Sequence, residues 1–290
     1  MPIYKASNFK LFHGDCIKVM SDLHSPVDMI FADPPYKLSN GGFTCQSGKK
    51  VSVNKGKWDK SKGLAEDHKF NLQWLNMCKE VMNPNATIWI SGTYHIIYSI
   101  GFALHELGFK ILNEIAWFKP NASPNLSCRY FTASHETLIW AARDKNSKHI
   151  FNYQEMKKMN GGRQMRSVWE IPSPSKKEKI YGKHPTQKPI ALLERIILSS
   201  TNPEQIVLDP FTGSGTTGEA AIKFDRKFIG IEKEKEYIDL TFRRLKAVSA
   251  IRTIPSRVDN DCNKLVSIGS LFESQEQYYP SRSEISQSFC

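Results

Sequence analysis

Long hydrophobic runs are absent from this chain of 290 residues, and so are paired cysteines. No apolar stretch approaches the roughly 20 residues that a membrane-spanning helix needs, and the first residues, MPIYKASNFKLFHGD, lack the apolar segment of a secretory signal. The six cysteines are scattered without a CxxC pair, a pattern that indicates neither a zinc site nor a disulfide framework. We therefore expect a cytoplasmic protein with no membrane partner and no resident metal.

Acidic residues are scarce relative to basic ones: 29 Asp and Glu stand against 40 Lys and Arg, for a formal net charge of +11. The excess gathers in two loop-like stretches. Residues 37–62 hold seven Lys and one Asp, and residues 143–188 hold twelve Lys or Arg and four acidic residues. This distribution favours binding of a polyanion, because contacts to phosphates supply most of the nonspecific affinity for nucleic acid. A solvated, Lys-rich surface is the alternative.

The apolar pattern predicts an α/β fold. Buried strands are expected at 27–32, 86–91, 111–118, 137–142, 205–210 and 227–232. Amphipathic helices are expected over 70–81, from about His95 to Leu107, and after Pro189. Strands that alternate with helices favour a doubly wound, mostly parallel sheet. Residues 37–65 and 143–188 interrupt the alternation, and we expect the first to be functional or disordered.

A glycine-rich sequence, VLDPFTGSGTTGEAA at 207–221, follows an apolar run and leads into a predicted helix. Gly213 and Gly215 allow the backbone to approach a ligand closely. A phosphate-binding P-loop would need a Lys that this loop lacks. Gly213, Gly215 and Gly218 fit the spacing GxGxxG, so the loop alone leaves a nicotinamide-dependent oxidoreductase open. Glu232 follows the next strand, where a carboxylate would accept hydrogen bonds from ribose hydroxyls, and a solvated acid is the alternative.

A second motif, DPPY at 33–36, lies directly behind a predicted strand in the sequence FADPPYKLSN. Alone it is typical of a Pro-rich turn. Together, DPPY and the later DPFTGSGTT at 209–217 resemble the S-adenosylmethionine-dependent amino methyltransferases of DNA, in the permuted order of their β class. The resemblance extends to about residue 248 and implies a Rossmann-like methyltransferase fold with a small basic insertion. The expected parts are a catalytic half at 1–142, a basic target-recognition region at 143–183, a cofactor-binding half at 184–248 and a polar tail at 249–290.

The resemblance implies S-adenosylmethionine as the cofactor and assigns residues to it. FHGDCIKVM at 12–20 and HPTQKPIALLERII at 184–197 resemble two further cofactor-binding segments of the family. In the second segment, Lys188 would face the carboxylate of the cofactor. The cofactor-binding candidates are Asp15, Cys16, Asp33, Thr186, Lys188, Asp209, Phe211, Gly213, Gly215, Thr216 and Glu232, with His184 as a further one.

The catalytic candidates are Asp33, Pro34, Pro35 and Tyr36. The adenine N6 atom is a weak nucleophile because its lone pair is delocalised into the ring. Hydrogen bonds from N6 to the Asp33 carboxylate and the Pro34 carbonyl would direct that lone pair at the methyl group. Tyr36 would stack on a base flipped out of the duplex, and the prolines would hold the loop rigid. Asp at the first position is more typical of adenine-N6 than of cytosine-N4 enzymes. Methylation of cytosine N4 or RNA, and a noncatalytic methyltransferase-like DNA-binding protein, remain alternatives.

Four further pieces, LSNGG, VSVNKGKWDK, PNLSCRYFT and GKHPTQKP, resemble the second, single-strand-capable adenine methyltransferases of restriction systems that recognise GATC. The expected partner is therefore DNA, double-stranded and also single-stranded. The resemblance admits a homodimer and a cognate restriction endonuclease as further partners, and the sequence itself specifies neither. Trp58 and Asp59 follow DPPY in a predicted loop, where they could contact DNA, and core packing is the alternative role for Trp58 and Tyr130. The DNA-binding candidates are Lys49, Lys50, Trp58, Arg129, Tyr130, Arg163 and Arg166.

Overall fold

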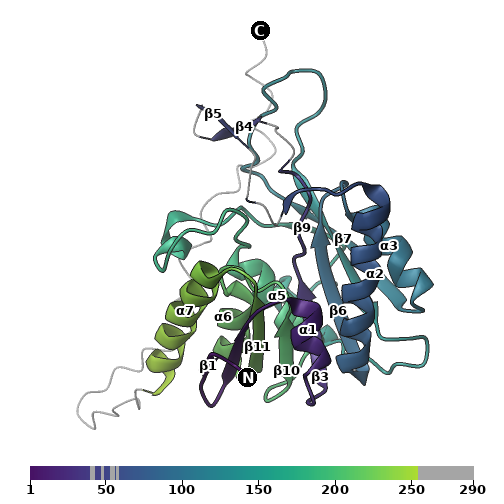
Figure 1. The fold of residues 1–290 in the computed structure, drawn as a ribbon, viewed down its shortest axis with the longest axis vertical. Coiled ribbons are helices and arrows are strands. Elements are labelled where there is room, and N and C mark those ends of the chain that lie inside the picture. The colour runs from purple at the N-terminus through teal and green to yellow at the C-terminus, as the bar shows by residue number, and fades with distance from the viewer. Residues whose placement is uncertain (40–42, 47–48, 53–55, 57–58, 254–290) are drawn as a thin grey trace. The chain divides into compact units, whose positions relative to one another are not determined.

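A computed structural model describes residues 1–39, 43–46, 49–52, 56 and 59–253 (Figure 1). Residues 1–253 form one compact unit. Of the polar tail predicted at 249–290, residues 249–253 belong to the last helix, and the rest lies outside the described residues. No helix within the described ranges combines the length and apolar character needed to cross a bilayer. The proposed division of residues 1–248 into two halves and a basic region stays a prediction.

The centre of the fold is a nine-stranded sheet. Five strands run parallel in the middle, the next strand is antiparallel to them, the one after it runs parallel to the five again, and a short strand closes each edge. In spatial order the strands are β1 (Tyr4–Lys5), β2 (Phe9–His13), β11 (Lys227–Glu232), β10 (Ile206–Asp209), β3 (Val27–Ala32), β6 (Met82–Gly92), β8 (His135–Ala142), β7 (Lys110–Phe118) and β9 (Val168–Glu170). A separate hairpin pairs β4 (Phe43–Gln46) with β5 (Lys49–Ser52). The predicted mostly parallel sheet is confirmed.

Helices cover both faces of this sheet (Figure 1). On one face, α1 (Cys16–Ser21), α2 (Leu64–Val81) and α3 (Ile97–Glu106) bury residues such as Met20, Trp74 and Ile100. On the other face, α5 (Ile190–Ser200), α6 (Thr216–Lys223) and α7 (Lys235–Thr253) bury residues such as Ile196 and Leu245. The short α4 (Tyr153–Met159) contacts α5. Two apolar layers around one sheet are the physical meaning of a doubly wound fold.

The predicted elements are present, with two differences. The helix expected over 70–81 begins earlier, at Leu64. The prediction missed its first residues, LAEDHK, because they are mostly polar and show no apolar periodicity. The strand expected at 86–91 begins at Met82, directly after that helix, and includes Pro84. The basic stretch also joins the main sheet: β9 pairs with β7, and Trp169 packs against Trp89 in the core.

The sheet places two loops side by side. From β10 the chain passes through α6 to β11 on one side, whereas from β3 it passes through α2 to β6 on the other. β10 and β3 are parallel neighbours, paired at Val207 and Met29, so the connections diverge between them. In open α/β sheets, ligands bind outside the carboxyl ends of the strands at such a point. Asp209 ends β10 and Asp33 follows β3, so both motifs meet there.

Candidate active site

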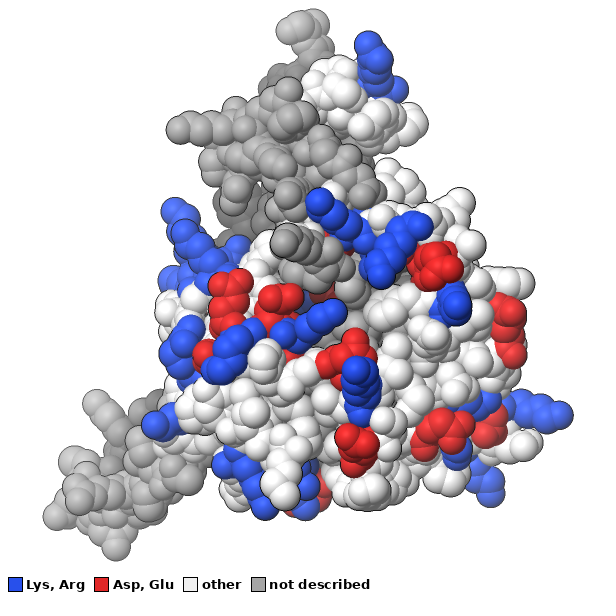
Figure 2. Space-filling view, viewed as in Figure 1, with Lys and Arg blue, Asp and Glu red and all other residues white. Residues whose placement is uncertain are grey.

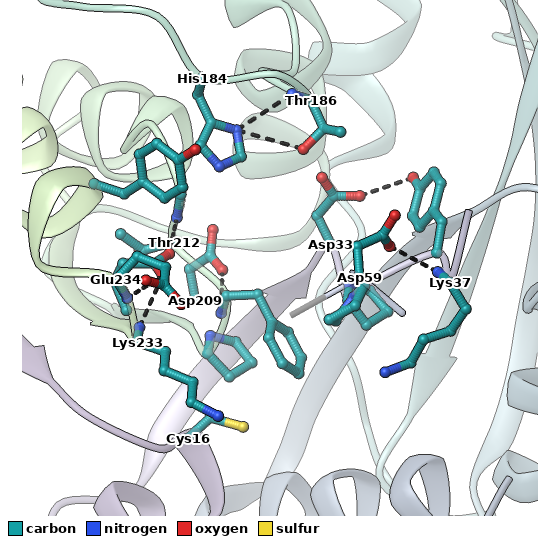
Figure 3. A pocket seen from close by; sticks show the side chains of 18 of the residues that line it. Cys16, Asp33, Lys37, Asp59, His184, Thr186, Asp209, Thr212, Lys233 and Glu234 are labelled. Carbon is teal, nitrogen blue, oxygen red and sulfur yellow. Dashed lines mark hydrogen bonds between the residues drawn. The ribbon is translucent and has the colours of Figure 1, made fainter. Parts of the chain in front are cut away.

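A pocket of about 680 Å³ opens at this switch point. Its volume lies within the range of small-molecule sites. Figure 3 shows Asp33 and Asp59 on one side of the pocket and Asp209, Thr212 and Glu234 on the other. The lining comes from six segments of the chain: 14–16, 31–38, 59–73, 184–188, 209–217 and 232–237. Within the described residues, no cluster of His, Cys, Asp or Glu is arranged to hold a metal ion.

The glycine loop keeps its shape through close packing and one buried acid. Gly215 has φ of +76°, and a Cβ atom there would lie 2.8 Å from Thr241 Cγ2, so a larger residue is excluded on both counts. Asp209 Oδ2 accepts a hydrogen bond from Thr217 Oγ1 at 2.6 Å, and Oδ1 accepts one from the Phe211 amide at 3.0 Å. Burial raises the pKa of Asp209 to about 7. Asp209 therefore holds the loop that forms one wall of the pocket.

Glu232 fixes the other end of that wall. Its Oε2 accepts a hydrogen bond from the Gly213 amide at 2.8 Å, and its Oε1 accepts bonds from the amides of Lys233 and Glu234 at 2.8 and 2.9 Å. Burial raises the pKa of Glu232, although these amides oppose the change. The alternative of a solvated acid is therefore wrong: Glu232 is a partly buried acceptor on the pocket wall, tied to the glycine loop.

Asp15 and Cys16 lie where α1 begins. Asp15 caps this helix, and its Oδ1 accepts hydrogen bonds from the Ile17 and Lys18 amides at 3.1 and 3.3 Å. Cys16 is buried, and burial together with the charge of Asp15 raises the pKa of its thiol to about 12. The Cys16 thiol is therefore neutral and unreactive, and it serves the pocket as a small apolar surface.

The DPPY loop carries a dense network of hydrogen bonds. The Tyr36 hydroxyl lies 2.8 Å from Asp33 Oδ1, 2.9 Å from Ser91 Oγ and 2.8 Å from Glu136 Oε2. Ser91 Oγ in turn donates to Asp33 Oδ1 at 2.5 Å. Burial, with the two carboxylates, raises the pKa of Tyr36 well above its ordinary value, so its hydroxyl stays protonated and donates. The acid and the ring of the motif are thus locked together.

Two lysines neutralise this network. Lys188 Nζ lies 2.6 Å from Asp33 Oδ2 and 3.6 Å from Glu136 Oε2, and Lys119 Nζ lies 2.9 Å from Glu136 Oε1. Burial works to raise the pKa of Glu136, but the two ammonium groups outweigh it and lower this pKa to about 2. Burial likewise works to lower the pKa of Lys188, and Asp33 and Glu136 raise it on balance. We refer to Asp33, Tyr36, Ser91, Lys119, Glu136 and Lys188 as the catalytic cluster.

Sequence reasoning missed half of this cluster. Ser91 lies near the end of β6, next to β3, and Glu136 lies at the start of the antiparallel β8, so both reach the same sheet edge as Asp33. The only sequence signal for Glu136 was its position as a charged residue at the start of an apolar strand. Lys188 lines the pocket, and its ammonium group pairs with Asp33 and Glu136; its predicted role toward the carboxylate of the cofactor stays a prediction.

Asp59 is buried, so the interpretation of this residue as a DNA contact is wrong. It is 2% exposed and accepts hydrogen bonds from the Lys37 amide at 2.7 Å, the Leu38 amide at 3.1 Å and Ser39 Oγ at 2.8 Å. Lys37 has φ of +60°, an uncommon conformation for a residue with a side chain. Asp59 therefore fixes the turn that follows DPPY (Figure 3).

The structure brings the cofactor and catalytic candidates together. All of them line the pocket except Gly215, which packs against Thr241. Thr186 and His184 both belong to the lining, and the Thr186 amide lies 3.4 Å from His184 Nδ1. Of the DNA-binding candidates whose side chains the structure describes, none lines the pocket. Arg129, Tyr130, Arg163 and Arg166 are exposed, so core packing is not the role of Tyr130. Lys49 and Lys50 lie on β5, and Trp58 lies outside the described residues.

Residues 27–243 match the family model of the N6/N4 DNA methylases. The chain belongs to this DNA methylase family. It is 53% identical over 248 residues to the type II methyltransferase M2.DpnII of Streptococcus pneumoniae, a match that covers 85% of this chain and 92% of the relative. It is 50% identical over 245 residues to M2.MboI of Moraxella bovis, covering 84% and 90%. The resemblance inferred from DPPY and the glycine loop is confirmed.

Solved structures agree with this assignment. The complex of the methyltransferase M1.HpyAVI with SAM is 34% identical, with a TM-score of 0.63 over 82% of this chain and 98% of that one. The cytosine-N4-specific PvuII methyltransferase, at 20% identity and a TM-score of 0.68, shares the fold. This DNA methylase therefore has the Rossmann-like fold expected from its alternation of strands and helices.

Proposed function

We propose that this DNA methylase transfers the methyl group of S-adenosylmethionine to N6 of adenine in DNA, within GATC, as a modification enzyme of a type II restriction-modification system. The observation that carries the proposal is the meeting of DPPY and the glycine loop in one pocket. The type II methyltransferases that are about half identical to this chain support the system and, through the sequence pieces discussed above, the GATC site. Asp33 at the head of its motif supports adenine as the target.

The residues of the pocket fit S-adenosylmethionine. Glu232 and Asp15 offer carboxylate acceptors for the ribose and the adenine, and Phe211 adds an apolar side chain to the same lining. A Cβ atom at Gly213 would lie 3.1 Å from the His184 ring, so the glycine keeps the pocket wall open. When bound, this cofactor supplies an electrophilic methyl group on a positively charged sulfur. In this arrangement we assign the carboxylates of Glu232 and Asp15, together with the Gly213 loop, to holding it.

Asp33 orients the nucleophile. Its carboxylate accepts hydrogen bonds from Ser91 and Lys188 and shares the single Tyr36 hydroxyl hydrogen with Glu136, and a carboxylate has about four lone-pair positions. The remaining position can accept one N6 hydrogen, and the Pro34 carbonyl can accept the other. Both hydrogen bonds draw the N6 lone pair out of conjugation and toward the methyl group. After the new N–C bond has formed, N6 is acidic and loses one proton.

Contacts to DNA follow from charge and exposure. Figure 2 shows Lys and Arg side chains at the borders of the hollow in this face, alongside acidic ones. Arg163 and Arg166 follow α4 and are exposed, as a contact to phosphates requires. Lys49 and Lys50, on the β4–β5 hairpin, and Trp58 belong to the same proposal. We place the enzyme in the cytoplasm beside a cognate restriction endonuclease, and a homodimer stays a prediction.

The test is transfer of labelled methyl from S-adenosylmethionine to duplex and single-stranded oligonucleotides with GATC, followed by nucleoside analysis. We expect N6-methyladenine in GATC and none where that adenine is replaced. Asp33→Ala should abolish transfer and change DNA binding by no more than a few-fold, whereas Asp22→Ala, which alters an exposed acid, should leave the rate unchanged. Label on cytosine N4, on RNA only or on no nucleic acid would overturn the proposal.

A further inference from the structure

The loop between β7 and β8, residues 119–134, projects from the edge of the sheet at which the pocket opens (Figure 1). Its tip is built around Asn125. The Asn125 side chain donates to the Tyr130 carbonyl at 2.6 Å and accepts from the Ser127 amide at 3.0 Å and from Ser127 Oγ at 2.9 Å. These bonds give the tip a defined shape although it contributes nothing to the core. We call residues 125–131 the hairpin tip.

The hairpin tip exposes large apolar side chains. Leu126 is 50% exposed, Tyr130 is 72% exposed and Phe131 is 99% exposed. Burying an aromatic side chain lowers the free energy, so neighbouring aromatics that stay exposed to water indicate a surface that another molecule covers. The hydrogen bonds of the Asn125 side chain hold the backbone of the tip in the shape that leaves these side chains exposed.

The charge around the tip indicates what covers it. Residues 119–134 include Lys119 and Arg129 and no Asp or Glu. At the base of the loop, Asn121 Oδ1 accepts a hydrogen bond from the Ser173 amide at 3.0 Å, and the chain continues from Ser173 into the exposed Lys176 and Lys177. A flat aromatic surface beside a guanidinium group, in a basic setting, suits stacked nucleic-acid bases.

The base of the same loop contacts the catalytic cluster. The Lys119 amide donates to the Ser134 carbonyl at 2.7 Å and closes the loop. Directly below, Lys119 Nζ bonds Glu136, which bonds the Tyr36 hydroxyl. The hairpin tip and the catalytic cluster are therefore connected through the two ends of one loop, and the proposed function places the flipped adenine at this cluster. A base that leaves the duplex leaves a gap in the stack, and apolar side chains can be inserted between bases to stabilise such a distortion.

We propose that the hairpin tip inserts Phe131, supported by Tyr130, into the DNA duplex and stabilises the conformation in which the target adenine is flipped out. This role rests on the proposed function. It assigns extraction of the adenine from paired DNA to the hairpin tip, whereas methyl transfer takes place in the pocket. Its consequence is that the tip matters only while the target adenine has to be extracted from a paired stack. A target that is already unpaired bypasses it.

The experiment compares Phe131→Ala and Tyr130→Ala with the wild-type enzyme on two substrates. One is a paired GATC duplex, and the other is the same duplex with an abasic site opposite the target adenine. We expect Phe131→Ala to lower kcat/KM on the paired duplex by about tenfold or more, the scale of one lost aromatic stack on a base, and by less than about twofold on the unpaired one. Phe102→Ala, at a 61% exposed residue on α3, is the matched control and should match wild type on both.

Fluorescence of 2-aminopurine in place of the target adenine gives a second readout. The fluorescence gain on binding should be smaller for Phe131→Ala than for wild type. Equal losses on both substrates, or no loss on the paired duplex, would overturn the proposal. So would a change in molar mass measured by light scattering, because the tip would then belong to a contact between copies of the chain. A wild-type enzyme that methylates neither substrate would instead refute the proposed function.

Discussion

Replacing Glu136 by Gln tests whether the catalytic cluster is held together by its charge balance. Glu136 and Asp33 stand against Lys119 and Lys188, so the substitution leaves one positive charge without a counterion in a site where the side chain of Glu136 is 13% exposed. The pKa of Glu136 falls from an ordinary 4.5 to about 2. Each pH unit of this difference corresponds to about 1.4 kcal/mol, so the ionised carboxylate stabilises the fold by about 3 kcal/mol. Breaking a buried ion pair typically costs a similar amount.

The direction of the pH dependence follows from the lowered pKa. The stabilisation by Glu136 is fully present above the unfolded pKa of 4.5 and is lost as pH falls through the folded value of about 2. Urea unfolding monitored by circular dichroism should therefore give Glu136→Gln a free energy of unfolding about 3 kcal/mol below wild type near neutral pH. The difference should shrink by about 2 kcal/mol near pH 3, which lies about 1.5 pH units below the unfolded pKa. Glu114→Gln, at an exposed position on β7, is the control and should match wild type.

The same variant should slow methyl transfer. Without Glu136, Asp33 is the carboxylate of the cluster that holds Lys188, and the Tyr36 hydroxyl loses a charged acceptor. We expect kcat to fall by about tenfold or more, while KM for S-adenosylmethionine changes little, because Glu136 does not line the pocket. A variant as stable as wild type near neutral pH, or one whose difference does not vary with pH, would refute the charge-balance reasoning.

Two further predictions concern residues beside the pocket. Asp59→Ala removes the acceptor of three hydrogen bonds to residues 37–39, so kcat in the oligonucleotide assay should fall by about tenfold, with partial recovery in Asp59→Asn; wild-type turnover in Asp59→Ala would contradict the positioning role. Iodoacetamide near pH 8 should alkylate the exposed Cys128 and spare Cys16, whose pKa burial raises to about 12, so a peptide map of the native protein with alkylated Cys16 would contradict the buried thiol.

The sequence was sufficient for those features that local pattern controls. Apolar runs located the six main strands, and the two motifs follow strands at the switch point because parallel strands end at one edge. The catalytic cluster is different, since its contacts are long-range: Lys188 reaches Asp33 across 155 residues, and Tyr36 reaches Glu136 across 100. No spacing rule connects such residues. Asp59 was misassigned for a related reason, because burial is decided by tertiary packing and charge alone does not reveal it.

Because the catalytic cluster is buried, ionic strength should affect DNA binding and the methyl-transfer step differently. Mobile ions screen charges that face water, and they act weakly on pairs that are removed from it. The side chains of Lys188, Asp33 and Glu136 are 7%, 13% and 13% exposed, whereas Arg129, Arg163 and Arg166, which are proposed to meet DNA, are exposed. Added salt therefore weakens capture of the substrate and leaves the field around the nucleophile nearly unchanged. Cellular changes in ion concentration would set how often this enzyme engages DNA, and not how fast it reacts once engaged.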